Sequence, residues 1–256
     1  MSSWVYRGLQ TGIKTTAYPE EQDTHAGVSP GLPLGRELAG GDAGRVADRC
    51  PTGALARSTD RVLVDQRRCV HCFRCARGAS DVLAWQPGYE WGALASTANR
   101  EKALGSAFAR SLHIRVVDTG DCGACLREVK QLNNPYYNIH RLGFFITPTP
   151  RQADILLVVG PGTDQTRRAL EKTYAAMPTP RLVIAVGACA LSGGVFGPSF
   201  TCSAGVGAIV PVDVEVPGNP PPPLAILHAL LVATGRRPPA QSMDISPRGL
   251  DPGAGP

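Results

Sequence analysis

The sequence predicts an α/β protein in which a doubly wound parallel sheet follows a small, loop-rich module. Two continuous apolar runs, at residues 154–160 and 181–187, are typical of strands buried on both faces. Helical patterns lie between the expected strands, and this alternation favours a parallel sheet with helices on both faces. The content of Gly and Pro, 29 and 23 in 256 residues, predicts many turns and long loops, and the first hundred or so residues are predicted to be loop-rich.

The chain divides into four predicted segments. They are a reduced module at residues 1–84, a linker at 85–110, a sheet domain at 111–235 and a disordered tail at 236–256. The tail is assigned from its Pro, Gly and polar composition, which offers little apolar surface to bury. The first module is small and rich in Gly and Pro, so we expect a bound metal group to stabilise it.

The expected elements follow in chain order. The first module has short strands around residues 54–56 and 61–64, and the second half of the linker, from about 100 to 111, has a helical pattern. In the sheet domain we expect strands at 112–118, 154–160, 181–187 and 208–213, and helices at 122–132, 163–176 and 224–234.

Composition argues against several functions. The net charge of +5 includes no run of like charges, so no nucleic-acid partner is expected. No apolar stretch approaches the roughly 20 residues that span a bilayer, and the N-terminus lacks a signal-peptide core. We therefore expect a soluble, cytoplasmic chain whose membrane contact comes through partners. Residues 160–162 lack the dinucleotide fingerprint and no phosphate loop is present, so the sheet is interpreted as a scaffold and not as a nucleotide domain.

Eight cysteines are the main signal. With no export signal, metal binding is favoured over a disulfide framework. The cysteines fall into two groups, Cys50, Cys69, Cys72 and Cys75, then Cys122, Cys125, Cys189 and Cys202. Four thiols in each group are what two 4Fe–4S clusters require.

The first group has a ferredoxin pattern. Cys69, Cys72 and Cys75 form a C-x₂-C-x₂-C run, and Cys50 followed by Pro51 matches the Cys-Pro tail of such a run. A zinc site is the alternative, because four thiolates also suit zinc.

The cysteines that this chain lacks, compared with a two-cluster ferredoxin, all belong to the same cluster site. In two-cluster ferredoxins, the last cysteine of each run ligates the other cluster. The positions that would hold a second cluster here are Gly40, Ala43, Val46 and Ala79. One site is therefore erased and the other is complete. His71, inside the intact run, is interpreted as a neighbour of the cluster or a surface residue and not as a ligand.

The second group is placed by the predicted sheet. Cys122 and Cys125 directly follow the first expected strand and open a helix, and Cys189 directly follows the third. Ligands of open parallel sheets bind at the carboxyl ends of strands, so these thiols are expected at one edge. Gly123 lets the backbone approach a cluster, and the helix N-terminus directs N–H groups at anionic sulfur.

Further motifs complete the pattern, at residues 132–137, 141–143, 150–158, 187–194 and 211–217. With them, residues 112–232 resemble the small subunit of membrane-bound, energy-converting nickel–iron hydrogenases of the formate hydrogenlyase type, and the related 20 kDa subunit of complex I. Residues 8–19 also look like the N-terminal strand of the ferredoxin-like subunits of these complexes. The chain thus resembles a fusion of a reduced ferredoxin-like module and a flavodoxin-like domain. The spacing from Cys122 to Cys125 favours the hydrogenase side, because complex I proteins usually have adjacent cysteines there.

The resemblance implies an electron-transfer subunit with two 4Fe–4S clusters. Its partners would be a large catalytic subunit, a ferredoxin-like subunit and, indirectly, membrane subunits. One alternative is the equivalent subunit of a complex I-like NADH or quinone oxidoreductase without hydrogenase activity. Another is a non-redox zinc or assembly protein. The family also places a carboxylate at Glu128 that can relay protons; the alternative is a glutamate stabilised by the helix dipole.

One position departs from the family. The family's fourth ligand lies in a Gly-Cys-Pro-Pro turn, where this chain has Asn219. Cys202, seventeen residues upstream, is predicted to supply the missing thiolate. The alternatives are an inert Cys202 with Asn219 or an outside ligand on the fourth iron, or a three-iron cluster. The sequence leaves open the partner's metal, the donor and acceptor, the direction of electron flow, ion pumping and the redox potentials.

Overall fold

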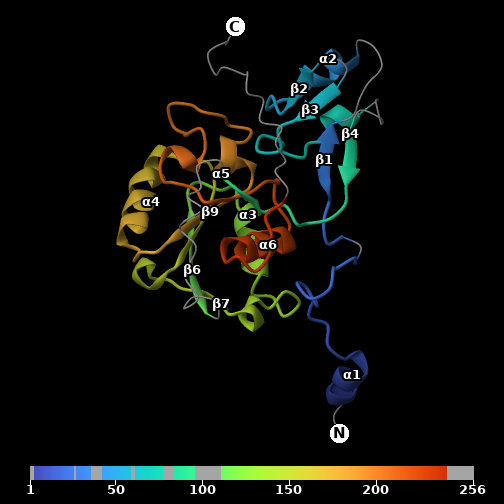
Figure 1. Ribbon diagram of the computed structural model, residues 1–256, viewed down its shortest axis with the longest axis vertical. Coiled ribbons are helices and arrows are strands. Elements are labelled where there is room, and N and C mark those ends of the chain that lie inside the picture. Colours follow the sequence, from blue (N-terminus) through green and yellow to red (C-terminus); the bar gives the residue numbers. More distant parts are fainter. Residues whose placement is uncertain are drawn as a thin grey trace.

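The structure, a computed structural model, describes residues 3–25, 27–35, 42–58, 61–77, 83–95 and 111–240. Figure 1 shows the small sheets of the N-terminal module beside the domain that carries the large sheet. Helix α1 (Ser3–Thr11) lies apart from both, and none of its side chains is buried. Among the described residues, no helix has both the length and the apolar character needed to cross a membrane.

The large sheet has six strands. They are β5 (Ala93–Leu94), β6 (Leu112–Asp118), β7 (Phe144–Ile146), β8 (Ile155–Val159), β9 (Leu182–Val186) and β10 (Val214–Val216). Their spatial order is β5-β10-β9-β8-β6-β7, and every pair is parallel except β5 with β10. In chain order the parallel strands are arranged 2-1-3-4-5, the flavodoxin-like order. The predicted α/β fold with a doubly wound sheet is therefore confirmed.

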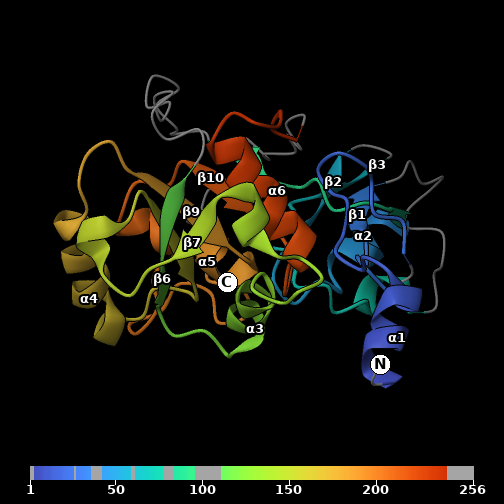
Figure 2. The ribbon, with the colours of Figure 1, turned by 90° about the horizontal axis from the view of Figure 1, so that it is seen from below.

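Two helical layers cover this sheet (Figure 2). Helices α3 (Ala124–Gln131) and α6 (Pro223–Ala233) pack in one core, on the face that presents Ile155 and Leu157. Helices α4 (Asp164–Ala176) and α5 (Ala188–Ser192) pack in a second core, on the face that presents Leu156 and Val158. Because both faces are covered, β8 and β9 are buried along their whole length, which explains their continuous apolar sequences.

One predicted strand is wrong. Residues 208–213 are not a strand: the short helix η5 (Val206–Ala208) ends there, a loop follows, and β10 begins only at Val214. Pro211 has no N–H for a strand ladder. The Asp213 carboxylate accepts a hydrogen bond from the Val183 amide at 2.9 Å and so closes the loop onto β9.

The N-terminal module consists of two small sheets and two short helices. Strand β1 (Leu32–Gly35) pairs with β4 (Leu83–Gln86), and β2 (Leu55–Ser58) pairs with β3 (Arg61–Val64), both antiparallel. The helices are α2 (Asp42–Ala47) and η1 (Arg74–Ala76). Strands β2 and β3 fall where short strands were expected.

The module's core includes one of the four positions at which the sequence predicts that a second cluster site has been lost. Val46, at one of the four replaced positions, is 3% exposed and packs with buried side chains of β2, β3 and β4. Three thiols of the first group, Cys50, Cys69 and Cys75, border the same small core. Gly40, Ala79 and the side chain of Ala43 lie outside the described part. At Val46, apolar packing has thus taken the place that a ligand would hold.

The residues on both sides of the predicted sheet domain, 111–235, also take part in its structure. Strand β5 lies within the expected linker and forms one edge of the large sheet. In the expected tail, Arg236 donates from Nη1 to the Leu142 carbonyl at 2.6 Å, and the Ala240 amide donates to Gly92. The helix expected at about 100 to 111 lies outside the described residues, apart from its last residue. The tail from residue 241 also lies outside them.

Candidate metal centres

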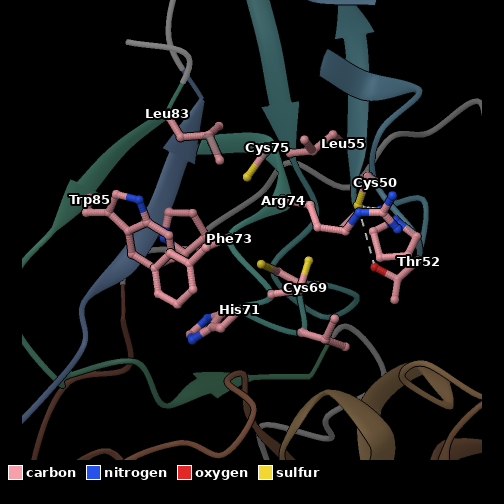
Figure 3. A pocket seen from close by; sticks show the side chains of 15 residues that line it. Cys50, Thr52, Leu55, Cys69, His71, Phe73, Arg74, Cys75, Leu83 and Trp85 are labelled. Carbon is pink, nitrogen blue, oxygen red and sulfur yellow. Dashed lines mark hydrogen bonds between the residues drawn. The ribbon is translucent and has the colours of Figure 1, made fainter. Parts of the chain in front are cut away.

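The four thiols of the first group line one pocket (Figure 3). Cys50 follows α2, whereas Cys69, Cys72 and Cys75 lie on or beside the loop between β3 and η1. The remaining wall is mostly apolar and includes Leu83. The pocket therefore presents four sulfur ligands with few competing polar groups.

The sulfurs of this pocket influence one another. Burial, with smaller contributions from the neighbouring thiols of Cys50, Cys75 and Cys72, raises the pKa of Cys69 to about 12. Burial and then Cys72 also raise the pKa of Cys75. Thiols in this setting release their protons when a cationic group binds and neutralises the thiolates. Four such thiols in one pocket fit a 4Fe–4S cluster.

The loop that carries Cys69, Cys72 and Cys75 has an unusual backbone. His71 and Phe73 have φ of 49° and 57°, in the left-handed region that is uncommon for residues other than glycine. The His71 ring lies edge-on to Trp85 at 5.6 Å and to Trp91 at 6.4 Å between centroids. Its Nε2 has no hydrogen-bond partner among the described residues. His71 is therefore packed between aromatic rings of both modules.

The second group gathers at the carboxyl edge of the large sheet. Cys122 and Cys125 follow β6, and Cys189 follows β9. Burial raises the pKa of Cys125 and of Cys189, and the charges of Asp121 and Cys122 contribute to both. These three thiols therefore lie near one another at the carboxyl edge of the sheet, the edge where ligands of open parallel sheets bind, and their role as one site stays a prediction.

The Cys125 and Cys189 sulfurs each lie so close to a glycine that no larger residue would fit there. A Cβ on Gly187, whose φ is +89°, would lie 2.5 Å from the Cys125 sulfur. A Cβ on Gly194 would lie 2.6 Å from the Cys189 sulfur. Both distances are too short for any side chain, so the glycine-rich turn after β9 is required by the close approach of the sulfurs.

Cys202 lies on the same edge of the sheet. It pairs across an isolated bridge with Thr163, just after β8. The Thr163 methyl in turn lies against Gly120, where an added Cβ would be 2.6 Å away, and Gly120 precedes Cys122 by two residues. The charge of Cys202 also raises the pKa of Cys189, although it is the weakest of the named causes. Its place on this edge agrees with the predicted role, which stays a prediction.

Asn219 lies beside the same thiols. The Ala188 amide donates to the Gly218 carbonyl at 2.8 Å, so the turn that carries Asn219 runs along the residues just before Cys189. The Asn219 side-chain amide donates to the Val70 carbonyl at 3.1 Å, in the other module. Within the described ranges, no group of three or more His, Cys, Asp or Glu side chains is arranged to hold a metal ion.

Glu128 lies on α3, three residues after Cys125, and is half-buried. Burial raises the pKa of this carboxyl, and its charge raises the pKa of Tyr137. The first turn of α3 contains no acidic residue, so Glu128 lies beyond the part of the helix where the dipole acts strongly. A carboxyl that holds its proton more tightly than usual suits proton transfer, and that role stays a prediction.

The raised pKa of Glu128 predicts a pH-dependent stability. A carboxyl with a raised folded-state pKa destabilises the fold above its unfolded pKa, because the folded chain binds the proton more tightly. This cost is absent well below the ordinary value of 4.5, develops as the pH rises, and is complete above the folded-state pKa. Glu128→Gln should therefore raise the melting temperature at about pH 8 and change it little at about pH 4. Circular dichroism melts at both pH values would measure this.

The matched control is Glu171→Gln, which changes an exposed glutamate on α4. It should leave the melting temperature unchanged at both pH values. A Glu128→Gln variant with the same melting temperature as the unaltered chain at high pH would show that the carboxylate is well solvated.

The geometry defines a class: a flavodoxin-like domain with thiols at its switch point, joined to a module with a second thiol pocket. Residues 122–233 match the family model described as "NADH ubiquinone oxidoreductase, 20 Kd subunit". An uncharacterized protein of Methanocaldococcus jannaschii is 43% identical over 122 residues, which are 48% of this chain and 82% of that relative. The chain belongs to the family of the 20 kDa NADH ubiquinone oxidoreductase subunit.

Named relatives are hydrogenase subunits. The "Probable membrane-bound hydrogenase subunit mbhJ" of Pyrococcus furiosus is 43% identical over 124 residues, 48% of this chain and 74% of the relative. "Formate hydrogenlyase subunit 7" of Escherichia coli is 36% identical over 140 residues, 55% of each chain. The resemblance predicted from the sequence is thus confirmed, and the chain's relatives are subunits of hydrogenase or complex I-type oxidoreductase complexes.

Proposed function

We propose that this chain is an iron–sulfur electron-transfer subunit of a membrane-associated nickel–iron hydrogenase-like complex. It relays electrons between a large catalytic subunit and a ferredoxin-like partner, on the cytoplasmic side of the membrane and bound there through partner subunits. The observation that carries the proposal is that two separate groups of thiols, one on each module, occur in a chain whose relatives are hydrogenase subunits.

Each site has its own set of ligands in this proposal. The first 4Fe–4S cluster would be held by Cys50, Cys69, Cys72 and Cys75, and the second by Cys122, Cys125, Cys189 and Cys202. When bound, such clusters take up and release single electrons. The surrounding chain excludes water and supplies hydrogen bonds to sulfur, which together set the redox potential. One such bond is already formed, from the Ala54 amide to the Cys50 sulfur at 3.2 Å.

Glu128 is proposed as a proton relay beside the second site. Its carboxyl is half-buried, and Tyr137 is within electrostatic reach. A carboxyl whose pKa is raised by burial holds its proton more tightly than usual and can pass that proton on when a partner's active site requires one.

A complex I-like enzyme without hydrogenase chemistry is the second candidate. It is favoured by Asn219, which stands where the family has its fourth cysteine, and by the description of the matching family model. The large subunit's sequence separates the two candidates. Two Cys-x-x-Cys pairs able to bind nickel would decide for a hydrogenase.

The experiment that tests the proposal is anaerobic purification followed by iron, sulfide and zinc analysis and EPR of the dithionite-reduced chain. About eight irons per chain and two interacting 4Fe–4S signals are expected. About seven irons, with a three-iron signal on oxidation, would show that the second site lacks a fourth ligand. Zinc without iron would overturn the proposal in favour of a non-redox zinc or assembly protein.

A further inference from the structure

The N-terminal module contacts the large domain through residues 15–23 and through one short segment beside the first thiol group, residues 67–70. Three polar contacts reach this segment from the large domain. They come from Ser192 at the end of α5, from Glu215 on β10, and from Asn219 in the turn before α6. All three partners lie in the half of the chain that carries the second thiol group, and the segment itself contains Cys69.

The Asn219 contact joins the two metal sites most directly. Its Nδ2 donates to the Val70 carbonyl at 3.1 Å, and Val70, which is 7% exposed, lies between Cys69 and Cys72. On the other side, the turn of Asn219 is fixed to the residues before Cys189 by the bond from the Ala188 amide to the Gly218 carbonyl. The Asn219 side-chain amide therefore connects two places. One is the turn beside Cys189, in the second thiol group, and the other is the turn that carries Cys69 and Cys72, in the first.

The other two contacts are more exposed. The Ser192 hydroxyl oxygen lies 3.0 Å from the carbonyls of both Arg67 and Ala188, so its single proton is shared between them. Arg67 Nη2 lies 2.9 Å from Glu215 Oε1, but the Arg67 side chain is 53% exposed, and ion pairs this open to water contribute little. The half-buried Asn219 is thus the contact whose removal should loosen the segment most.

The chemistry of the side chain agrees with such a role. A neutral amide is a poor substitute for a thiolate on iron, because cubane clusters in proteins are held by thiolates. It is, however, well suited to donate a hydrogen bond to a buried carbonyl that would otherwise be unpaired.

We propose that Asn219 is a positioning residue: it fixes the turn of Cys69 and Cys72 against the second site and so sets the separation of the two sites for electron transfer within one chain. The electron-transfer part rests on the proposed function. The contact itself does not, since it joins two groups of this chain.

The test uses the full chain, purified anaerobically, as Asn219→Ala and Asn219→Gln variants. Asn133→Ala is the control, because Asn133 is an exposed residue of the same type on the large domain. Hydrogen exchange of the backbone amides at residues 66–73 reports the contact with or without metal. The splitting that arises between the two reduced clusters in EPR reports their separation, while iron content and the individual signals report their assembly.

We expect Asn219→Ala to keep its iron, to exchange faster at residues 66–73 and to lose much of the splitting. Asn219→Gln retains the amide, so it should recover part of the protection from exchange and part of the splitting. Asn133→Ala should match the unaltered chain in both measurements. Unchanged exchange and splitting in Asn219→Ala would overturn the proposal, as would loss of the second site's iron, which would make Asn219 a ligand. If the unaltered chain binds no iron, the proposed function fails, and the exchange measurement alone decides the contact.

Discussion

Cys69→Ala is expected to remove about four irons per chain and to leave the second site's iron in place. Burial, with smaller contributions from the other three thiols of its pocket, raises the pKa of the Cys69 thiol to about 12, so this sulfur lies among all its expected co-ligands. Its loss leaves three thiols in this small pocket, and we expect these three not to retain a cluster. Iron and sulfide analysis with EPR would show one of the two signals missing.

The same variant should destabilise the N-terminal module. Val46, Leu55 and Val64 belong to a small core that Cys50, Cys69 and Cys75 border, so a metal group held by these thiols would add to the few contacts that hold the module together. Metal binding to such sites is coupled to folding. We therefore expect a lower melting temperature and faster proteolysis within residues 42–77, with the large sheet unaffected.

Thr52→Val is the matched control for Cys69→Ala. Thr52 lines the same pocket and donates to the Arg68 carbonyl at 2.8 Å, but it is not a sulfur ligand. Valine has nearly the same shape, so the control should keep all its iron and lose only a modest amount of stability, on the order of 1 kcal/mol. A Cys69→Ala chain that retains its full iron content would remove the first group from the list of cluster sites.

The large sheet was the most predictable part of the fold. Strands β8 and β9 are buried on both faces, and this burial leaves the apolar runs that identify them in the sequence. Strand β7 was not predicted, because three residues at a sheet edge are too short to show a period. The strand predicted at residues 208–213 was wrong because its apolar residues fill a loop: Val210 and Val212 are buried in the core, but strand β10 begins only at Val214.

The part of the candidate site that could be predicted from the sequence is the part formed by cysteines, because their spacing indicates the metal group. The spacing of Cys69, Cys72 and Cys75 identified a pocket that the structure also contains, with Cys50 joining from a distant part of the module. The contact between Asn219 and Val70 left no signal, because a hydrogen bond between residues 149 positions apart has no periodicity or spacing.

Cys202→Ala is expected to lower the iron content from about eight to about seven and to produce a three-iron signal on oxidation. The reason is the number of thiolates. Cys122, Cys125 and Cys189 supply three at the carboxyl edge, and Cys202, paired with Thr163 just after β8, is the further thiol on that edge. Ser203→Ala, which changes the neighbouring residue, is the control and should keep both clusters.

A second change separates a lost ligand from a damaged loop. In Cys202→Ala/Asn219→Cys, the family's usual cysteine is restored in the turn fixed to Ala188, so the fourth iron should be recovered. The contact with Val70 would still be missing, because a thiol cannot replace the amide donor at that distance. Recovered iron with weakened splitting between the clusters would assign ligation to Cys202 and positioning to Asn219. If Cys202→Ala alone keeps both 4Fe–4S signals, the fourth ligand lies elsewhere and Cys202 only packs against Thr163.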